Sequence, residues 1–273
     1  MNSTLLAPTQ SSSSSIVSLP KSPSNTIPRN RNGILDVIRG ITMVSMILYH
    51  GVWDCVYLLH QDWQWFSSDF AYVWQQSICW VFILLSGFCW SYSKHPVKRG
   101  LIVSGAGILV SVATWLIMPE NQILFGVLTL IGFCMLIMTG LHPILKQISA
   151  LWGTVGFFVL FLLTKSVNQG FLGFDFASLF LPKYWYQGMI ATFLGFPDPA
   201  FRSTDYFSVF PWMFLFITGY FLHKLLADSS LLRSGAKVQI QPFAFLGKHS
   251  MIIYLIHQPV LYGILSVFSF LTN

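Results

Sequence analysis

The sequence predicts an all-α, polytopic membrane helix bundle with about seven transmembrane helices and its N-terminus on the inside. The first observation is composition: of the 273 residues, 54% are hydrophobic and only 9% are charged, whereas a soluble domain carries roughly 25% charged residues. The second is that seven apolar segments are each long enough to cross a bilayer. The third is that the basic residues gather in the short loops of one side.

The first 30 residues differ from the rest of the chain. They include the Ser- and Pro-rich stretch TQSSSSSIVSLPKSPSNTIPRNR and hold no long apolar run. Such a segment cannot bury enough apolar surface to fold, so we expect a disordered cytoplasmic tail over 1–30. It lacks the charged and apolar regions of a signal peptide. Residues 31–273 then form one transmembrane domain.

The predicted spans alternate between two sides that differ in charge. They lie near 34–57, 72–92, 100–118, 122–140, 147–164, 207–226 and 248–269. If the N-terminus is cytoplasmic, nearly all the basic loop residues fall on the cytoplasmic side, and only Lys165, Lys183 and Arg202 fall opposite. The net charge of +6 is therefore an orientation signal and does not indicate nucleic-acid binding.

The longest connection between predicted spans covers 165–206 and contains FASLFLPKYWYQGMIATFLGF. Proline, glycine and lysine interrupt this stretch too often for a spanning helix. We expect an interfacial or a re-entrant helix on the outer side, and which of the two occupies 171–197 stays open.

The cysteines do not indicate a metal site. Cys55, Cys79, Cys89 and Cys134 all lie in apolar segments, without the close spacing of metal ligands. We therefore expect buried free thiols and no metal. The sequence also contains no Walker motif, nucleophile elbow or metal-ligand cluster.

Four ionisable residues fall in the first predicted span, LDVIRGITMVSMILYHGVWD. Each residue of an α-helix turns by about 100°, so Arg39 and His50, eleven steps apart, return to within about 20° of one another. Asp54 lies one turn beyond His50, and Asp36 falls about 60° to the other side. Ionisable groups are costly in a membrane, so this polar stripe is expected to face the bundle interior or a wet cavity.

The two ends of the stripe suit different tasks. Arg39 lies toward the cytoplasm and offers a fixed charge for phosphate. His50, about 16 Å away by helix rise, offers a base near neutral pH, and Asp54 could fix its tautomer and stabilise its cation. In the alternative interpretation, Arg39 extends to the inner headgroups and His50 only hydrogen-bonds a neighbouring helix.

The segment LDVIRGITMVSMILYH resembles the first helix of the integral-membrane acyltransferases, in which an arginine is followed by ten residues and a histidine. Four further stretches resemble the bacterial relatives of the heparan-α-glucosaminide N-acetyltransferase catalytic domain. They are WQQSICWVFILLSGFCWSYSKHPVKRG, ILFGVLTLIGFCMLI, DYFSVFPWMFLFITGYFLHK and FLGKHSMIIYLIHQP. The resemblance covers nearly all of the chain after residue 33.

This resemblance implies acyl transfer across a membrane, with acetyl-CoA as the donor on the cytoplasmic side. It also implies that His50 is the catalytic histidine and Arg39 its motif partner. The large lumenal domain of the eukaryotic enzyme has no counterpart in these 273 residues, so its sugar specificity is not carried over.

Further basic residues are candidates for binding the acyl donor. Lys98 and Arg99, in an inner loop, could attract the CoA phosphates. His249 could meet the same phosphates, or it could serve as a helix cap or headgroup contact. His257, near mid-membrane in the last span, could hydrogen-bond the acyl donor or acceptor, or only a neighbouring helix beside a kink at Pro259.

Candidates for binding the acceptor lie toward the outer side. Gln75 and Gln76 open the second span at roughly the depth of His50 and could bind the acceptor or a developing oxyanion. An interhelical amide bond is the alternative. Asp205 and Tyr206 precede the sixth span and could contact an acceptor, although Asp205 could instead cap a helix.

With the resemblance, these residues predict a membrane-embedded acyltransferase of the plasma (inner) membrane. Its partners would be the lipid bilayer, acyl-CoA and an extracytoplasmic glycan acceptor, with no nucleic acid, and whether it forms a homo-oligomer stays open. The alternative function is a small-solute or proton-coupled transporter, which would also line a cavity with Arg, His and Asp. Against a transporter, the sequence shows no inverted repeat and no pair of broken helices.

Overall fold

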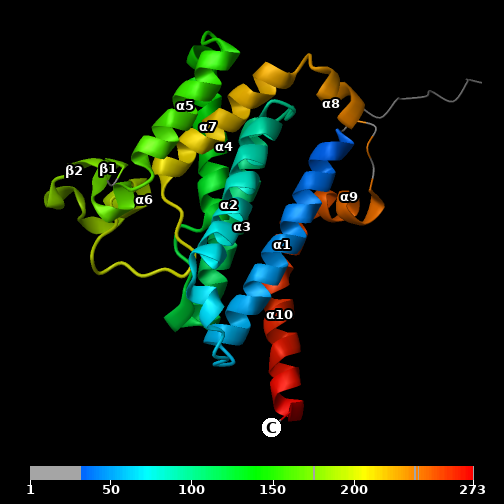
Figure 1. Ribbon diagram of the computed structural model, residues 1–273, viewed down its shortest axis with the longest axis vertical. Coiled ribbons are helices and arrows are strands. Elements are labelled where there is room, and N and C mark those ends of the chain that lie inside the picture. The colour runs from blue at the N-terminus through cyan, green and yellow to red at the C-terminus, as the bar shows by residue number, and fades with distance from the viewer. Residues whose placement is uncertain (1–31, 175, 237, 239, 273) are drawn as a thin grey trace, which may run out of the picture. The chain divides into compact units, whose positions relative to one another are not determined.

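The computed structural model describes residues 32–174, 176–236, 238 and 240–272. Seven of its helices are long and apolar enough to cross a membrane, which confirms the predicted polytopic helix bundle (Figure 1). They are α1 (Gly33–Tyr57), α2 (Asp69–Trp90), α3 (Pro96–Ile117), α4 (Val127–Leu145), α5 (Ala150–Thr164), α7 (Val209–Leu226) and α10 (Ser250–Thr272). The tail expected over 1–30 lies outside the described residues.

These helices follow the predicted spans closely, except that α4 begins at Val127 and not near residue 122. The residues before Val127 hydrogen-bond to the connection between α5 and α7 and therefore cannot join the helix. The backbone N–H of Leu124 donates to Oγ of Ser203 at 2.9 Å, and that of Phe207 donates to the carbonyl of Phe125 at 2.8 Å. Phe125 also has a positive φ of 57°, which is incompatible with an α-helix.

Glycines allow the closest helix contacts. Helix α1 packs against α2, α10 and the short α9 (Gln241–Lys248), and α2 packs against α7 (Figure 1). A Cβ on Gly40 would come within 2.0 Å of the carbonyl oxygen of Phe243 in α9. A Cβ on Gly87 would come within 1.9 Å of the carbonyl oxygen of Phe216 in α7. Small residues permit such close approach of two backbones, so these positions fix α1 on α9 and α2 on α7.

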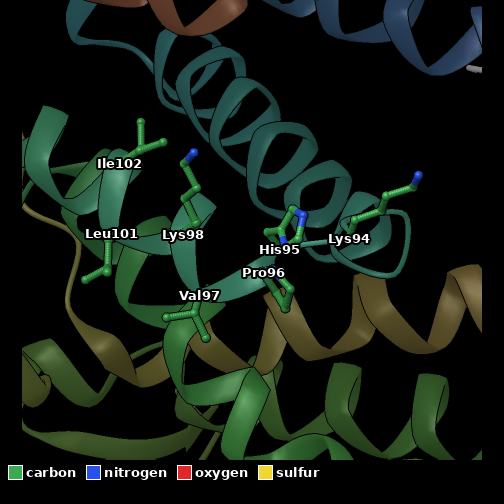
Figure 2. A pocket seen from close by; sticks show the side chains of 7 residues that line it. All are labelled: Lys94, His95, Pro96, Val97, Lys98, Leu101 and Ile102. Carbon is green, nitrogen blue, oxygen red and sulfur yellow. The ribbon is translucent and has the colours of Figure 1, made fainter.

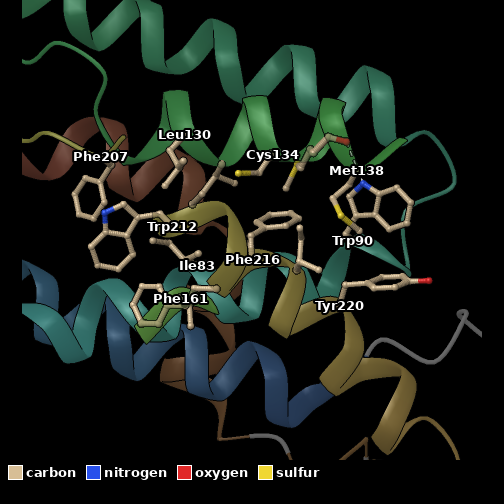
Figure 3. Packing of buried hydrophobic residues seen from close by; sticks show 14 of the residues in the cluster. Ile83, Trp90, Leu130, Cys134, Met138, Phe161, Phe207, Trp212, Phe216 and Tyr220 are labelled. Carbon is tan, nitrogen blue, oxygen red and sulfur yellow. Dashed lines mark hydrogen bonds between the residues drawn. The ribbon is translucent and has the colours of Figure 1, made fainter. Parts of the chain in front are cut away.

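The largest apolar cluster joins α2, α3, α4, α5 and α7. Figure 3 shows its centre, where Leu130, Phe161 and Phe216 are fully buried. The indole N–H of Trp90 donates to the carbonyl of Met135 at 3.2 Å. No residue of α1 belongs to this cluster. The polar stripe therefore lies apart from the main core, against a smaller cluster that α1 forms with α2 and α10.

The connection between α5 and α7 differs from the expected interfacial or re-entrant helix. It holds an antiparallel hairpin of β1 (Phe171–Phe174) and β2 (Ala177–Phe180), and the short helix α6 (Gly188–Leu194). The positive φ values of Gly170 and Gly173 favour the hairpin because residues with a left-handed backbone interrupt a helix. Among the described residues of this connection α6 is the one α-helix, and its seven residues are too few to cross a membrane.

Short elements complete the connections. Helix α8 (Ser230–Gly235) and helix α9 lie between α7 and α10. Single turns of 3₁₀ helix are η1 (Gln64–Ser67), η2 (Pro119–Asn121), η3 (Val167–Gln169) and η4 (Lys183–Trp185).

The orientation of the bundle can be tested with reporter fusions. A fusion after residue 97 or after residue 235 is expected to read cytoplasmic, and a fusion after residue 120 external, because loops rich in Lys and Arg stay in the cytoplasm. Paired phosphatase and fluorescent-protein reporters would measure this. A cytoplasmic signal at residue 120 would contradict the orientation.

Candidate active site

Helix α1 runs without interruption through the polar stripe. Asp36 and Asp54 are buried, and so are Met43 and Met46, which lie between them on the same face. Leu48, on the opposite face, is 58% exposed. The stripe therefore faces other helices and not the lipid, as the helical period predicts.

Two histidines from different helices meet in the C-terminal half of α1. The ring centroid of His50 lies 5.0 Å from that of His257 in α10, in an edge-to-face arrangement. The Nδ1 atom of His257 lies 2.6 Å from the carbonyl oxygen of Tyr254. A carbonyl only accepts, so in the neutral ring Nδ1 carries the proton and Nε2 keeps its lone pair. That Nε2 is buried and has no partner among the described residues.

Asp54 is bound to α10 and not to His50. The amide Nε2 of Gln258 donates to Oδ1 of Asp54 at 2.7 Å, and no side-chain hydrogen bond in the described part of the chain joins Asp54 to His50. The other atoms of the pair, Oδ2 of Asp54 and Oε1 of Gln258, are buried without a described partner. Buried polar atoms normally have partners, so these atoms and Nε2 of His257 keep hydrogen-bonding capacity for a ligand.

The N-terminal end of the stripe is centred on Arg39. Its Nη1 donates to Oδ1 of Asp36 at 3.3 Å, and its Nη2 donates to Sγ of Cys89 at 3.1 Å. Cys89 is one of four free cysteines and lies in the last turn of α2. The Arg39 side chain is 15% exposed, so it points toward α2 and does not extend to the headgroups.

Helix α9 brings His249 to the same end of α1. A Cβ on Gly247 would come within 1.9 Å of the carbonyl oxygen of Asp36, one turn before Arg39. The next two residues, Lys248 and His249, are exposed. The Nδ1 atom of His249 lies 2.9 Å from a backbone carbonyl of α9, so the imidazole also contacts the end of that helix.

An open groove lies where α2 turns into α3 (Figure 2). Its volume is about 680 Å³, and it is lined by Lys94, His95, Pro96, Val97, Lys98, Leu101 and Ile102. The lysines are exposed, whereas Arg99 is half-buried. The groove follows the end of α2 that Arg39 contacts through Cys89. Lys98 and Arg99 lie in the first turn of α3, a few residues along the chain from Cys89.

Asp205 joins the connection between α5 and α7 to helices α4 and α10. Its Oδ2 accepts hydrogen bonds from the backbone N–H of Val127 at 3.4 Å and from the hydroxyl of Tyr254 at 3.5 Å. It thus caps α4, not the helix that follows it in the chain. Burial raises the pKa of the Asp205 carboxyl to about 6, although both hydrogen bonds act in the opposite direction. Tyr254 also holds His257, so Asp205 and His257 are linked through one residue.

The other candidates for acceptor binding make local contacts. Gln76 accepts a hydrogen bond from the indole of Trp80 in its own helix at 3.3 Å. Gln75 is half-buried, and its side chain forms no hydrogen bond with another described residue. The hydroxyl of Tyr206 donates to the carbonyl of Thr192 and accepts from Asn168. The contacts of Tyr206 hold the connection between α5 and α7 together.

Gln258 and Tyr254 complete the polar centre formed by His50, Asp54 and His257, although neither was predicted from the sequence. Both stand in YLIHQP beside His257. An uncharged amide and a phenol are common in apolar helices, so neither is a strong signal alone. Their proximity to a mid-membrane histidine was the available clue.

The fold and the polar centre define a multi-pass membrane protein whose first and last spans carry an ionisable site inside the bundle. Such groups mark functional sites in membrane proteins. The family model described as "Heparan-alpha-glucosaminide N-acetyltransferase, catalytic" matches residues 31–259. The chain belongs to this family, and is therefore an acyltransferase-type membrane enzyme. No curated protein and no solved structure matches the chain.

Proposed function

We propose that this chain moves an acetyl group from cytoplasmic acetyl-CoA to a sugar hydroxyl or amine on the outer side of the plasma membrane. The observation that supports this most is the single helix α1, which presents Arg39 and His50 on one inward face about 16 Å apart. The flexible arm of CoA can span this distance between its phosphates and its thioester. One helix thus carries a group for the phosphates and a group for the reaction.

The donor would enter from the end where the basic residues gather. Arg39 is a planar donor suited to phosphate oxygens, and its partners Asp36 and Cys89 hold it inside the bundle. His249 ends α9, which packs on α1, and Lys98 and Arg99 lie in the first turn of α3. All three would attract the remaining phosphate charge. These contacts would hold the adenine nucleotide of acetyl-CoA at the cytoplasmic side.

The reaction would take place at His50. The acceptor oxygen or nitrogen bonds to the thioester carbonyl carbon while its proton passes to His50. The C–S bond then breaks, and the CoA sulfur leaves as a thiolate that takes up a proton. The charge of Asp54, one turn away, stabilises the imidazolium. The same residues suit a variant in which His50 carries the acyl group between donor and acceptor.

The acceptor would approach from the outer side, where an envelope glycan is available. Gln75 and Gln76 lie near the outer end of α2 and offer amide groups to a sugar. Asp205 and Tyr206 form part of the connection between α5 and α7. Because they contact α4, α10 and Thr192, these residues would shape the entrance for the sugar more than they would bind it directly.

A thermal-shift measurement tests the donor. Detergent-purified protein is expected to be stabilised by micromolar acetyl-CoA and by CoA, because a ligand that binds only the folded state raises its stability. Stabilisation by neither compound at any concentration would contradict the proposal and favour a transporter.

Arg39 offers a sharper test of the donor site. Arg39→Ala is expected to weaken CoA binding by about 10-fold or more, since a charge-assisted hydrogen bond contributes about 1.5–3 kcal/mol. Arg39→Lys is expected to restore binding only in part, because a point charge replaces a planar fork. Calorimetric titration with CoA would measure both. Unchanged binding by Arg39→Ala would assign Arg39 a purely structural role beside Asp36.

A further inference from the structure

The two histidines of the polar centre are held to different degrees. The ring of His257 is bound through Nδ1 to the carbonyl of Tyr254, and the residue is 8% exposed. His50 is half-buried, and no side-chain hydrogen bond in the described part of the chain involves it. One imidazole therefore has a fixed tautomer and a free acceptor nitrogen, while no described side-chain hydrogen bond fixes the other.

We infer that His257 is a positioning residue for His50: its Nε2 accepts the N–H of His50 and takes up that proton during transfer. This inference rests on the proposed function. It assigns to His257 the orientation of His50 that the sequence suggested for Asp54.

The spacing of the rings fits this pairing. Each ring nitrogen lies roughly 1.1 Å from its centroid, so an N–H···N bond of about 2.9 Å places two imidazole centroids about 5 Å apart. The observed separation is 5.0 Å. No hydrogen bond joins the rings in the structure, and at this separation we expect rotation of the His50 ring to form one. The buried lone pair of His257 gains a partner by this rotation.

The pairing also fixes the reactive nitrogen of His50. Once one nitrogen donates to His257, the other keeps its lone pair and can face the acceptor. The acceptor proton then moves to that nitrogen, and the proton already on His50 shifts to Nε2 of His257. After the C–S bond breaks, His50 gives a proton to the thiolate, and His257 returns its proton to His50. All protons are thereby accounted for.

Neighbouring contacts hold the two histidines beside one another. Gln258, directly after His257, holds Asp54 one turn beyond His50. Tyr254 holds Nδ1 of His257 and donates its own hydroxyl to Asp205. Helices α1 and α10 are thus joined beside the paired rings, which explains why Asp54 is bound to Gln258 and not to His50.

Two substitutions test the roles of the two ring nitrogens of His257 one at a time. His257→Asn keeps a donor near Nδ1 but removes Nε2, and His257→Gln keeps an uncharged acceptor near Nε2. We expect kcat for acetyl transfer to fall about 10–100-fold in His257→Asn, with KM for acetyl-CoA unchanged, and to recover partly in His257→Gln. His142→Asn is the matched control in α4, where the ring lies against Trp90 and Tyr220. An unchanged kcat in His257→Asn would overturn the inference.

A spectroscopic measurement decides the pairing without enzyme activity. Nitrogen-15 NMR of histidine-labelled protein in detergent is expected to show His257 protonated at Nδ1, and to show that His257→Asn shifts the His50 nitrogen signals while His142→Asn does not. A proton on Nε2 of His257, or unchanged His50 signals, would overturn the inference. If the wild-type protein transfers no acetyl group, the proposed function fails, and these spectra alone still decide the pairing.

Discussion

Replacement of His50 by alanine is expected to reduce acetyl transfer by about 10²–10⁴-fold, the usual contribution of a general base. The protein is expected to stay folded, because His50 contributes ring contacts with Tyr49 and His257 but no side-chain hydrogen bond in the described chain. Binding of CoA is expected to stay nearly intact, because Arg39 lies at the other end of α1. A histidine that served only packing would show the reverse: lower stability and preserved activity per folded molecule.

The measurement is transfer from acetyl-CoA normalised to folded protein, with folding followed by thermal melting. His142→Ala serves as the control, because it also removes a partly buried span histidine but lies among Trp90 and Tyr220. Activity in His50→Ala above about a tenth of the wild-type value would be too small a loss for a general base and would end the proposed mechanism.

The second large effect concerns Asp54, which is fully buried. Asp54→Asn keeps an oxygen that can accept from Gln258 and keeps the shape of the side chain, but it removes the charge that stabilises an imidazolium. A rate loss of about 10–100-fold is expected, equivalent to about 1.4–2.7 kcal/mol. The loss is smaller than that of His50→Ala because the base is perturbed and not removed.

The double variant shows whether the two residues act as a unit. His50→Ala with Asp54→Asn is expected to be little slower than His50→Ala alone, because residues that act together in catalysis are not additive. Steady-state rates of the two single variants and the double variant would measure this. Losses that multiply would mean that Asp54 acts independently of His50.

Much of the fold was predictable because its cause is local in the chain. Bilayer thickness sets the length of each apolar segment, so all seven spans were found. Helical periodicity alone placed Asp36 and Asp54 on one inward face of α1. The predicted start of α4 was wrong because Leu124 and Phe125 form hydrogen bonds with residues about 80 positions away. No local sequence pattern indicates such long-range hydrogen bonds. The hairpin at 171–180 was missed for the related reason that apolar runs broken by glycine suit either a helix or a strand.

The site was only partly predictable because its contacts cross between helices. The sequence indicated His50 and His257 separately, but only the packing of α10 on α1 brings their rings together. The partner of Asp54 turned out to be Gln258, 204 positions away, and not His50 one turn away. Helix α9 places His249 beside the start of α1 through Gly247, a contact that depends on two backbones approaching closely.

Transfer across a sealed membrane tests the central claim most directly. The protein would be reconstituted in vesicles that enclose glucosamine and neutral sugars, with acetyl-CoA labelled in its acetyl group added only outside. Molecules inserted with the Lys94 end outward are expected to place the label on an enclosed sugar, and vesicles with His50→Ala are expected to place none. Label that stays on CoA with the wild-type protein, or equal transfer by His50→Ala, would contradict the account.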